Sequence, residues 1–187
     1  MKVAILCEYS GIVRNAFIEA GHDAISCDIL STELFGPHIQ DDLFNHDWSG
    51  YDLIIAHPPC TYLCNSGVSW LYRQKGRWDL MKHGAEFFKK ILDFPNKKIA
   101  IENPIMHKYA VEIIGRRQDQ IVQPWMFGHG ETKATGFWLK GLPKLKPTKI
   151  VDGREQRIHR LPPSPERSKL RSKTFLGIAE AMAEQWT

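Results

Sequence analysis

Long apolar runs are missing from this sequence. No stretch of its 187 residues is long and apolar enough to span a bilayer. The apolar start, residues 2–6, meets Cys7 and Glu8 too soon to form the hydrophobic region of a signal peptide. Internal repeats and low-complexity tracts are absent as well. We therefore expect a cytoplasmic protein without a membrane anchor.

Cysteine is scarce, with four residues in the chain. Cys7 and Cys27 fall at the ends of predicted strands, and nothing indicates a small secreted scaffold, so we expect reduced thiols. Cys60 and Cys64 lie near His57, but no second Cys/His pair has the spacing of a zinc site. We therefore predict no metal centre.

Acidic residues are scarce in one stretch of the chain. Between Lys140 and Lys173 there are eleven Lys and Arg residues against three acids, whereas the whole chain has a net charge of only +4. A basic segment on an acidic body is typical of proteins that contact phosphates, although many charged runs only solubilise a surface. We expect DNA as the partner. The arginines predicted to bind it are Arg154, Arg157, Arg160 and Arg171.

Strand and helix signals alternate over the first hundred residues, which predicts an α/β fold. Apolar runs predict strands at 2–6, 23–27, 51–56, 98–101, 120–123 and 135–139. Helical periodicity predicts helices at 11–20, 79–94 and 174–186, with Leu80 facing inward. We expect one domain over residues 1–187, with a mostly parallel sheet, helices on both faces and a basic irregular segment at about 144–173.

Polar residues follow four of the predicted strands. They are Glu8-Tyr9-Ser10-Gly11, Asp28, Pro58-Pro59-Cys60 and Glu102-Asn103-Pro104. The carboxyl ends of parallel strands lie at one edge of a sheet, so these four segments should meet at a single crevice. Gly11 would let the backbone approach a ligand, and Asp28 suits hydrogen bonding to ribose hydroxyls.

Cys60 is the most informative single residue. The apolar run at 53–56 stops at Pro58 and Pro59, which fix the backbone and place Cys60 in a rigid turn at a strand end. This placement suits a nucleophile. The alternative is a buried structural cysteine, which is the more common role of a free thiol.

These motifs resemble, in their order along the chain, those of the cytosine-5 DNA methyltransferases. The motifs are Tyr9-Ser10-Gly11, Asp28, Asp42, Pro58-Pro59-Cys60 and Glu102-Asn103. The likeness covers most of residues 1–140 and the closing helix from about Lys173. The chain looks like a small, phage-type member that lacks a full target-recognition domain, which would place it in the host cytoplasm. The resemblance implies a Rossmann-like, S-adenosylmethionine-dependent methyltransferase fold.

The same resemblance assigns roles to individual residues. Asp28 would hold the ribose of S-adenosylmethionine, while Asp42 and Leu43 would meet its adenine. The full set of cofactor-binding residues expected is Tyr9, Ser10, Gly11, Asp28, Ile29, Asp42, Leu43, Pro58 and Pro59. Cys60 and Glu102 would be catalytic, with Lys133 beside the base and Asn103 among the substrate contacts.

The implied chemistry explains these residue types. A Cys60 thiolate that adds to carbon 6 of cytosine makes carbon 5 nucleophilic toward a methyl sulfonium group. Glu102 would hydrogen-bond ring nitrogen 3 and carry or share a proton, so we expect burial to raise the pKa of its carboxyl group. The alternative for Glu102 is a solvated acid that caps the next segment. A duplex substrate would require the cytosine to be flipped out.

The chain departs from the family in three places. Ile12, Val13 and Arg14 follow Gly11 where further glycines are usual, and Thr135 replaces an arginine. The basic segment is too short to read several bases, which predicts low sequence specificity, a very short target site or a protein partner that supplies recognition. RNA or a free cytosine nucleotide is therefore an alternative substrate. A catalytically silent nucleic-acid-binding relative is another alternative.

Overall fold

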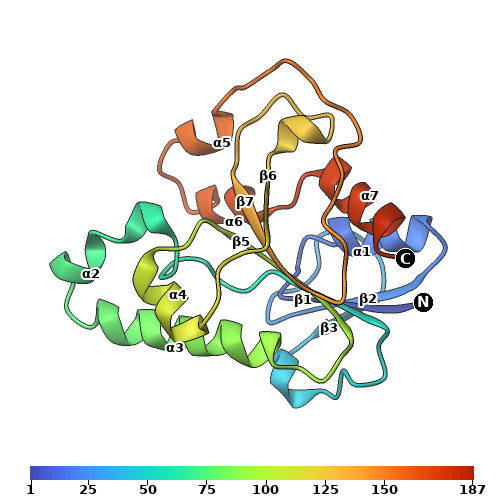
Figure 1. Cartoon of the computed structure of the whole chain (residues 1–187), viewed down its shortest axis with the longest axis horizontal. Helices are drawn as coiled ribbons and strands as arrows, with labels where there is room; N and C mark the ends of the chain where they lie inside the picture. The colour runs from blue at the N-terminus through green and yellow to red at the C-terminus, as the bar shows by residue number, and fades with distance from the viewer.

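A seven-stranded sheet forms the centre of the computed structural model, which describes residues 1–187 (Figure 1). The strand order is β3-β2-β1-β4-β5-β7-β6, and only β7 runs antiparallel to its neighbours. The strands are β1 (Lys2–Leu6), β2 (Asp23–Asp28), β3 (His38–Gln40), β4 (Leu53–Ala56), β5 (Lys98–Pro104), β6 (Gln120–Val122) and β7 (Thr135–Lys140). The predicted mostly parallel α/β sheet is confirmed.

Alternating side chains of the buried strands pack on opposite faces of the sheet. Val3 and Ile5 contact one core with α1 (Ile12–Glu19) and α7 (Leu176–Gln185). Ala4 and Leu6 contact the other core with α3 (Arg77–Leu92) and α4 (Lys108–Ile114). Because both faces of β1 are covered, the strand is apolar from Val3 to Leu6 instead of alternating with polar residues. Figure 1 shows the two helix layers on either side of the sheet.

Several elements differ from the sequence predictions. Leu80 is exposed, because the inward face of α3 is formed by Met81, Ala85 and Phe88. The short edge strand β3 and the helices α4 and α2 (Trp70–Arg73) carried no clear sequence signal. The basic segment is not wholly irregular, since it contains α5 (Arg157–Arg160) and α6 (Arg167–Ser172). Three prolines lie between these two turns of helix, at 162, 163 and 165, and keep them apart.

Three single turns of 3-10 helix complete the chain: Leu43–Asn45, Asn65–Gly67 and Pro124–Met126. No helix is long and apolar enough to cross a membrane. The four cysteines are free thiols.

Candidate active site

Two adjoining cavities lie at the carboxyl ends of β1, β4 and β5. The smaller has a volume of about 110 Å³ and contains Glu8, Ser10, Glu102 and Asn103 in its lining. The larger has a volume of about 970 Å³ and contains Asp28, Asp42 and Cys64. Their common wall is formed by Cys7, Tyr9, His57, Pro59, Cys60, Pro104, Lys133, Arg171 and Ser172. The predicted convergence of strand ends on one crevice is therefore confirmed.

Cys60 is held in place by a tight turn after β4. The Asn103 side chain donates a hydrogen bond from Nδ2 to the carbonyl oxygen of Pro58 at 2.8 Å, which ties this turn to β5. The amides of Leu63 and Cys64 both donate to the carbonyl oxygen of Cys60, at 3.0 and 3.1 Å. The chain thus turns back after Cys60 and brings a second thiol, Cys64, beside the first.

The side chains of Cys60 and Cys64 are hydrogen-bonded, and the pKa values of their thiols shift in opposite directions. A hydrogen bond from Cys60 lowers the pKa of Cys64 to about 6, assisted by hydrogen bonds from Ser66 and the positive charge of Arg171. The same hydrogen bond and burial raise the pKa of Cys60. The hydrogen bond thus acts on the two thiols in opposite directions, and the pKa of Cys64 is the lower of the two.

Glu102 is buried and bonded to His57, a contact that the sequence analysis missed. The Nδ1–H of His57 donates to Oε2 of Glu102 at 2.8 Å, and both side chains are about nine-tenths buried. Burial alone would raise the pKa of Glu102, but the hydrogen bond from His57 and the charge of Lys133 outweigh it and lower the pKa. The expectation of a raised pKa was wrong, because it considered burial without these two partners.

Lys133 approaches the site from the segment before β7. Its ammonium group donates to the carbonyl oxygen of Lys173 at 3.1 Å and lines both cavities. Thr135 is buried and donates to the carbonyl oxygen of Lys133 at 3.1 Å. Thr135 thus shapes the loop that carries Lys133 and adds no charge to the site.

Most of the predicted cofactor residues face the two cavities. Tyr9, Asp28, Ile29, Asp42, Leu43 and Pro59 line the larger one, and Ser10 and Pro58 line the smaller. The carboxylate of Asp28 accepts a hydrogen bond from the Leu30 amide, although burial raises its pKa overall. The Tyr9 hydroxyl donates to the carbonyl oxygen of Lys169 at 2.9 Å and so holds α6 against the cavity mouth.

Gly11 lines neither cavity, so the expected approach of the backbone to a ligand does not explain why a glycine is present at this position. Gly11 has a φ of 76°, and a Cβ atom there would lie 2.5 Å from the Arg14 guanidinium. Arg14 is fully buried and donates to the carbonyl oxygens of Leu34 and Phe35 at 2.7 and 3.1 Å. The positive φ, which other residues rarely adopt, therefore explains the glycine, and the Arg14 side chain, which fixes the loop between β2 and β3, fills the space beside it.

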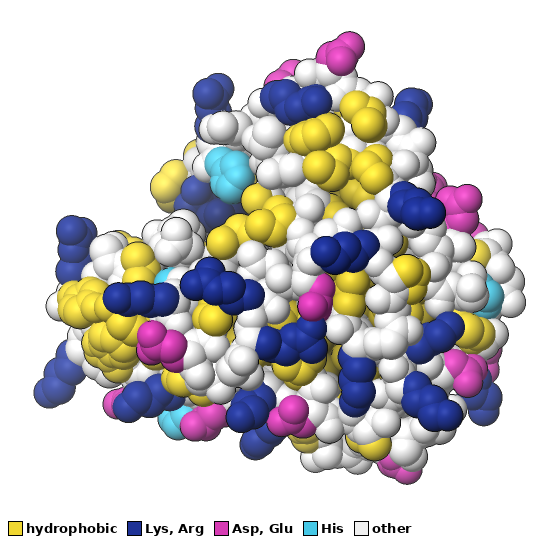
Figure 2. Space-filling model, in the orientation of Figure 1, with side chains coloured by type: hydrophobic (Ala, Val, Ile, Leu, Met, Phe, Trp, Pro, Cys, Tyr) yellow, Lys and Arg dark blue, Asp and Glu magenta, His cyan; other side chains and the backbone are white.

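Only one of the four predicted phosphate-binding arginines, Arg171, lines the cavities. Arg157 forms ion pairs with Glu131 and Glu155 at 2.9 and 3.2 Å. The guanidinium of Arg154 stacks on Trp125 at 3.8 Å. Arg160 is exposed. Lysine and arginine side chains are spread over the face drawn in Figure 2 and form no single patch.

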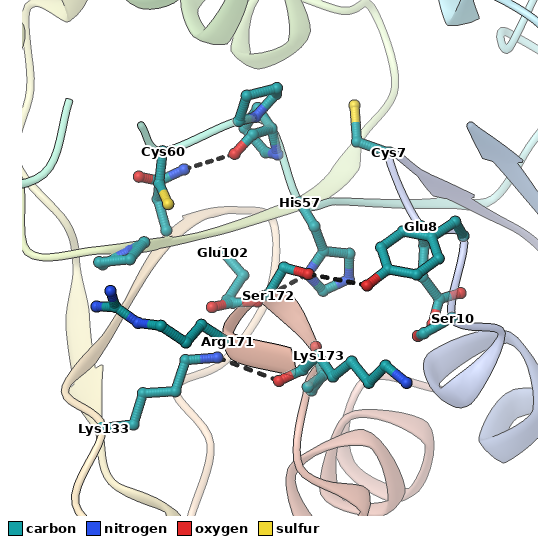
Figure 3. A pocket seen from close by; sticks show the side chains of 16 residues that line it. Cys7, Glu8, Ser10, His57, Cys60, Glu102, Lys133, Arg171, Ser172 and Lys173 are labelled. Carbon is teal, nitrogen blue, oxygen red and sulfur yellow. Dashed lines mark hydrogen bonds and ion pairs between the residues drawn. The ribbon is translucent and has the colours of Figure 1, made fainter. Parts of the chain in front are cut away.

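The site contains functional groups that the sequence analysis did not assign. His57 was considered there only as a metal ligand, although its position directly after β4 is itself a signal for this edge of the sheet. Figure 3 shows its ring between Glu102 and the turn that carries Glu8 and Ser10. Cys7 also lines both cavities, and burial raises the pKa of its thiol.

The cavities fit a nucleoside-bearing cofactor. Three carboxylates, Asp28, Asp41 and Asp42, line the larger cavity, where hydroxyl and amino groups would need acceptors. Two buried polar atoms near the smaller cavity, Nε2 of His57 and Oδ1 of Asn103, have no hydrogen-bond partner within the protein. Oδ1 of Asn96 and Nε of Arg167, which line neither cavity, are buried and unpaired as well, so unpaired atoms alone do not mark a binding site.

Comparison with known proteins identifies the fold. No protein-family model and no curated protein matches the chain. Among solved structures, the Entamoeba histolytica methyltransferase EhMeth matches with a TM-score of 0.55 and 15% identity, over 81% of this chain. A Spodoptera frugiperda DNMT2 mutant matches with a TM-score of 0.44 and 17% identity, over 87% of this chain and 55% of that one.

The present chain spans 57% of the length of EhMeth. At this identity the likeness concerns the fold and carries no substrate with it. The fold is Rossmann-like, with a mostly parallel sheet and helices on both of its faces.

Proposed function

We propose that this protein transfers a methyl group from S-adenosylmethionine to carbon 5 of cytosine in DNA, through a covalent adduct with Cys60. One observation carries the proposal. Cys60 and Glu102, from the ends of neighbouring strands β4 and β5, line the same small cavity, which adjoins the larger cavity of Asp28 and Asp42. A nucleophile and a carboxylate thus lie beside a nucleoside-sized site.

The residues present can hold the cofactor in the larger cavity, with its methionine end at the smaller one, which Ser10 lines. Asp28 would bind the ribose hydroxyls, Asp42 and Leu43 the adenine, and Tyr9 with Ser10 the methionine end. Pro58 and Pro59 would separate this site from the base. When bound, S-adenosylmethionine supplies a methyl group on a positively charged sulfur, which a nucleophilic carbon can take.

Cys60 must lose its proton to act as a nucleophile. The thiolate of Cys64 is the acceptor beside it, since the hydrogen bond between the two thiols already holds the proton in place. As the sulfur of Cys60 adds to carbon 6 of the ring, the proton moves to Cys64. The adduct then has its electron density at carbon 5, where methylation occurs.

Glu102 binds the pyrimidine edge in this account. Its carboxylate is ionised in the free protein, so it accepts a hydrogen bond from the 4-amino group of the base. A proton taken up from water would bridge Glu102 and ring nitrogen 3 in the adduct. Lys133 lies close enough to Glu102 and Cys60 to influence the ionisation of both. Its positive charge favours the anionic states that the reaction needs.

DNA is the proposed substrate because of the basic segment that includes Arg160 and Arg171. RNA or a free cytosine nucleotide is the second candidate, and one observation favours it. Arg154 and Arg157 are engaged within the protein, which leaves fewer free charges to contact a polymer backbone. The cytosine site would be the same for each of these substrates.

A substrate comparison tests the proposal. Purified protein and labelled S-adenosylmethionine are incubated with duplex DNA, single-stranded DNA, RNA or dCMP, and the nucleosides are identified by mass spectrometry after digestion. We expect 5-methyldeoxycytidine from DNA and none with Cys60→Ser. Label found only in RNA or only in dCMP would show that this molecule, and not DNA, is the substrate. Cofactor binding without any transfer would indicate a silent binding protein.

A further inference from the structure

We propose that Cys60 and Cys64 form a reversible disulfide when the protein meets hydrogen peroxide, and that Cys64 is the thiol oxidised first. The bond is a property of the chain itself and can be detected without any methyl transfer. Its consequence, the loss of the nucleophile, rests on the proposed function. Three observations carry the inference: the contact between the two side chains, the turn that joins them and the open cavity that both line.

The chain between the two cysteines makes a single turn whose geometry suits a disulfide. The amide of Cys64 donates to the carbonyl oxygen of Cys60 at 3.1 Å. A turn of this kind separates its end residues by about 6 Å, at a rise of about 1.5 Å per residue, and disulfides usually join Cα atoms about 4.4–6.8 Å apart. The two thiols also face each other, since they are hydrogen-bonded. The sulfur atoms can therefore bond without a large movement of the backbone.

The end of this turn is fastened to the segment that follows β5. The amide of Asn65 donates to the carbonyl oxygen of Ile105 at 2.8 Å. The amide of His107 donates to the carbonyl oxygen of Leu63 at 3.0 Å. The start of the turn is tied to β5 by the side chain of Asn103, as described above. These bonds keep the two thiols together in the folded protein, so neither has to leave its place to meet the other.

Cys64 has the features of a thiol that reacts with peroxide. The thiolate is the reactive form, and the pKa of Cys64 is lowered to about 6 by the hydrogen bond from Cys60, by Ser66 and by the charge of Arg171. Its side chain is half-buried and lines the larger cavity, where a small oxidant can reach it. Thiols that sense peroxide combine a low pKa and access with a second thiol nearby. Cys60 is that second thiol.

The other two cysteines lack these features, although they line the same larger cavity. Burial raises the pKa of both Cys7 and Cys27, that of Cys27 to about 11. The Cys27 thiol is fully buried and donates to the carbonyl oxygen of Asp41 at 3.5 Å. Figure 3 shows Cys7 apart from Cys60. We therefore expect Cys7 and Cys27 to stay reduced under conditions that oxidise the other pair.

The oxidation balances with hydrogen peroxide as the only other reactant. The Cys64 thiolate attacks one peroxide oxygen, the oxygen–oxygen bond breaks, and hydroxide leaves while Cys64 becomes a sulfenic acid. This hydroxide takes the thiol proton of Cys60. The sulfur of Cys60 then attacks the sulfur of Cys64, the sulfur–oxygen bond breaks, and a second hydroxide leaves. It takes up the proton that Cys64 lost on ionising, so two thiols and one peroxide give one disulfide and two water molecules.

Peptide mapping tests the disulfide directly. The protein is treated with a small molar excess of hydrogen peroxide and then denatured in excess N-ethylmaleimide, which blocks the remaining thiols. Chymotrypsin cleaves after Tyr62 and so places Cys60 and Cys64 on separate peptides. We expect these two peptides to stay joined in wild type and to separate after dithiothreitol. Cys7→Ser is the matched control, because it removes another cavity thiol and should leave the joined peptides unchanged.

Dimedone, which labels sulfenic acids, tests the order of oxidation. Cys60→Ser removes the second thiol, so the sulfenic acid should persist on Cys64 and take the label. In Cys64→Ser, labelling of Cys60 should be at least about tenfold slower, because burial keeps more of this thiol protonated. Melting temperatures confirm that each variant is folded.

The effect on the reaction is measured separately. Peroxide should reduce methyl transfer by wild type at least about tenfold, and dithiothreitol should restore it to within about twofold, because a disulfide is a reversible product of thiol oxidation. Cys7→Ser should show the same loss and the same recovery.

Three results would overturn the inference. Separate Cys60 and Cys64 peptides in peroxide-treated wild type, or a link between Cys7 and Cys27 in their place, would show that this pair does not form the disulfide. Dimedone on Cys60 of Cys64→Ser, with none on Cys64 of Cys60→Ser, would reverse the order. A loss of activity that dithiothreitol does not restore would show overoxidation. Reduced wild type without methyl transfer on any substrate would refute the proposed function alone, since the peptide link is scored independently.

Discussion

His57 and Glu102, 45 residues apart in the sequence, form a hydrogen bond of 2.8 Å between the ends of two adjacent parallel strands. This contact decides the charge of the site, because it keeps a buried carboxyl group ionised that burial alone would protonate. The sequence suggested a protonated Glu102, whereas the structure indicates an ionised Glu102 that accepts a hydrogen bond from His57. The ionisation of Glu102 should also be visible in the stability of the protein.

We predict that Glu102 stabilises the fold at neutral pH and not in acid. Its folded pKa is lowered from the ordinary value of 4.5, so the stabilisation is complete above that value and is lost as the pH falls through the folded pKa. Melting temperatures of wild type and Glu102→Gln should therefore differ most near pH 7 and converge in acid. A difference that grows as the pH falls would contradict the assignment.

A second prediction concerns the two thiols. Because the pKa of Cys64 is lowered to about 6 and that of Cys60 is raised, iodoacetamide at neutral pH should alkylate Cys64 first. Peptide mass spectrometry locates the label. In Cys64→Ser, Cys60 should react only at higher pH, because its neighbour can no longer take the proton. Preferential labelling of Cys60 in wild type at neutral pH would contradict this division of the proton.

A third prediction tests the buried arginine. Arg14→Ala should lower the free energy of unfolding by about 2–4 kcal/mol, because the carbonyl oxygens of Leu34 and Phe35 lose a charged donor. Arg14→Lys keeps the charge without the planar fork and should fall between Arg14→Ala and wild type. Denaturant unfolding measures both. A loss below about 0.5 kcal/mol for Arg14→Ala, the scale of ordinary surface changes, would show that another contact holds the loop.

A fourth prediction compares the exposed Arg160 with Arg157, which already forms ion pairs within the protein. Arg160→Gln should reduce the slope of log K for DNA against log salt by about one, because one phosphate contact is lost. Arg157→Gln should leave the slope unchanged, since its charge is already neutralised by Glu131 and Glu155. Binding titrations over a range of salt concentrations give both slopes. Equal reductions would show that Arg157 leaves its ion pairs to bind DNA.

The sequence predicted the parts of the fold that have a local pattern. The apolar runs of β1 and β4 and the helical periodicity of α7 each contain enough information to place an element. The edge strand β3 (His38–Gln40) does not, because it is three residues long, carries two polar residues and depends on pairing with β2. Leu80 was misplaced because the stripe of α3 that faces the core is decided by the helices around it.

The sequence predicted that Cys60 and Glu102 lie in one site, but it did not predict the residues that contact them. Cys60 follows β4 and Glu102 lies near the carboxyl end of β5, and these two strands are neighbours, so topology alone brings the two residues together. The contact of Glu102 with His57 links different strands and has no signature in either segment. The burial of Arg14 was also hidden, because an arginine is normally exposed and only the folded loop supplies the carbonyl oxygens that satisfy it.

The most direct test of the central claim is a double-label measurement at carbon 5. DNA that contains [5-³H]deoxycytidine is incubated with ¹⁴C-labelled S-adenosylmethionine and with wild-type protein or Cys60→Ser. We predict one tritium released to water for each methyl group transferred, and neither event with Cys60→Ser. Methyl transfer without tritium release would place the methyl group on another atom and contradict the account.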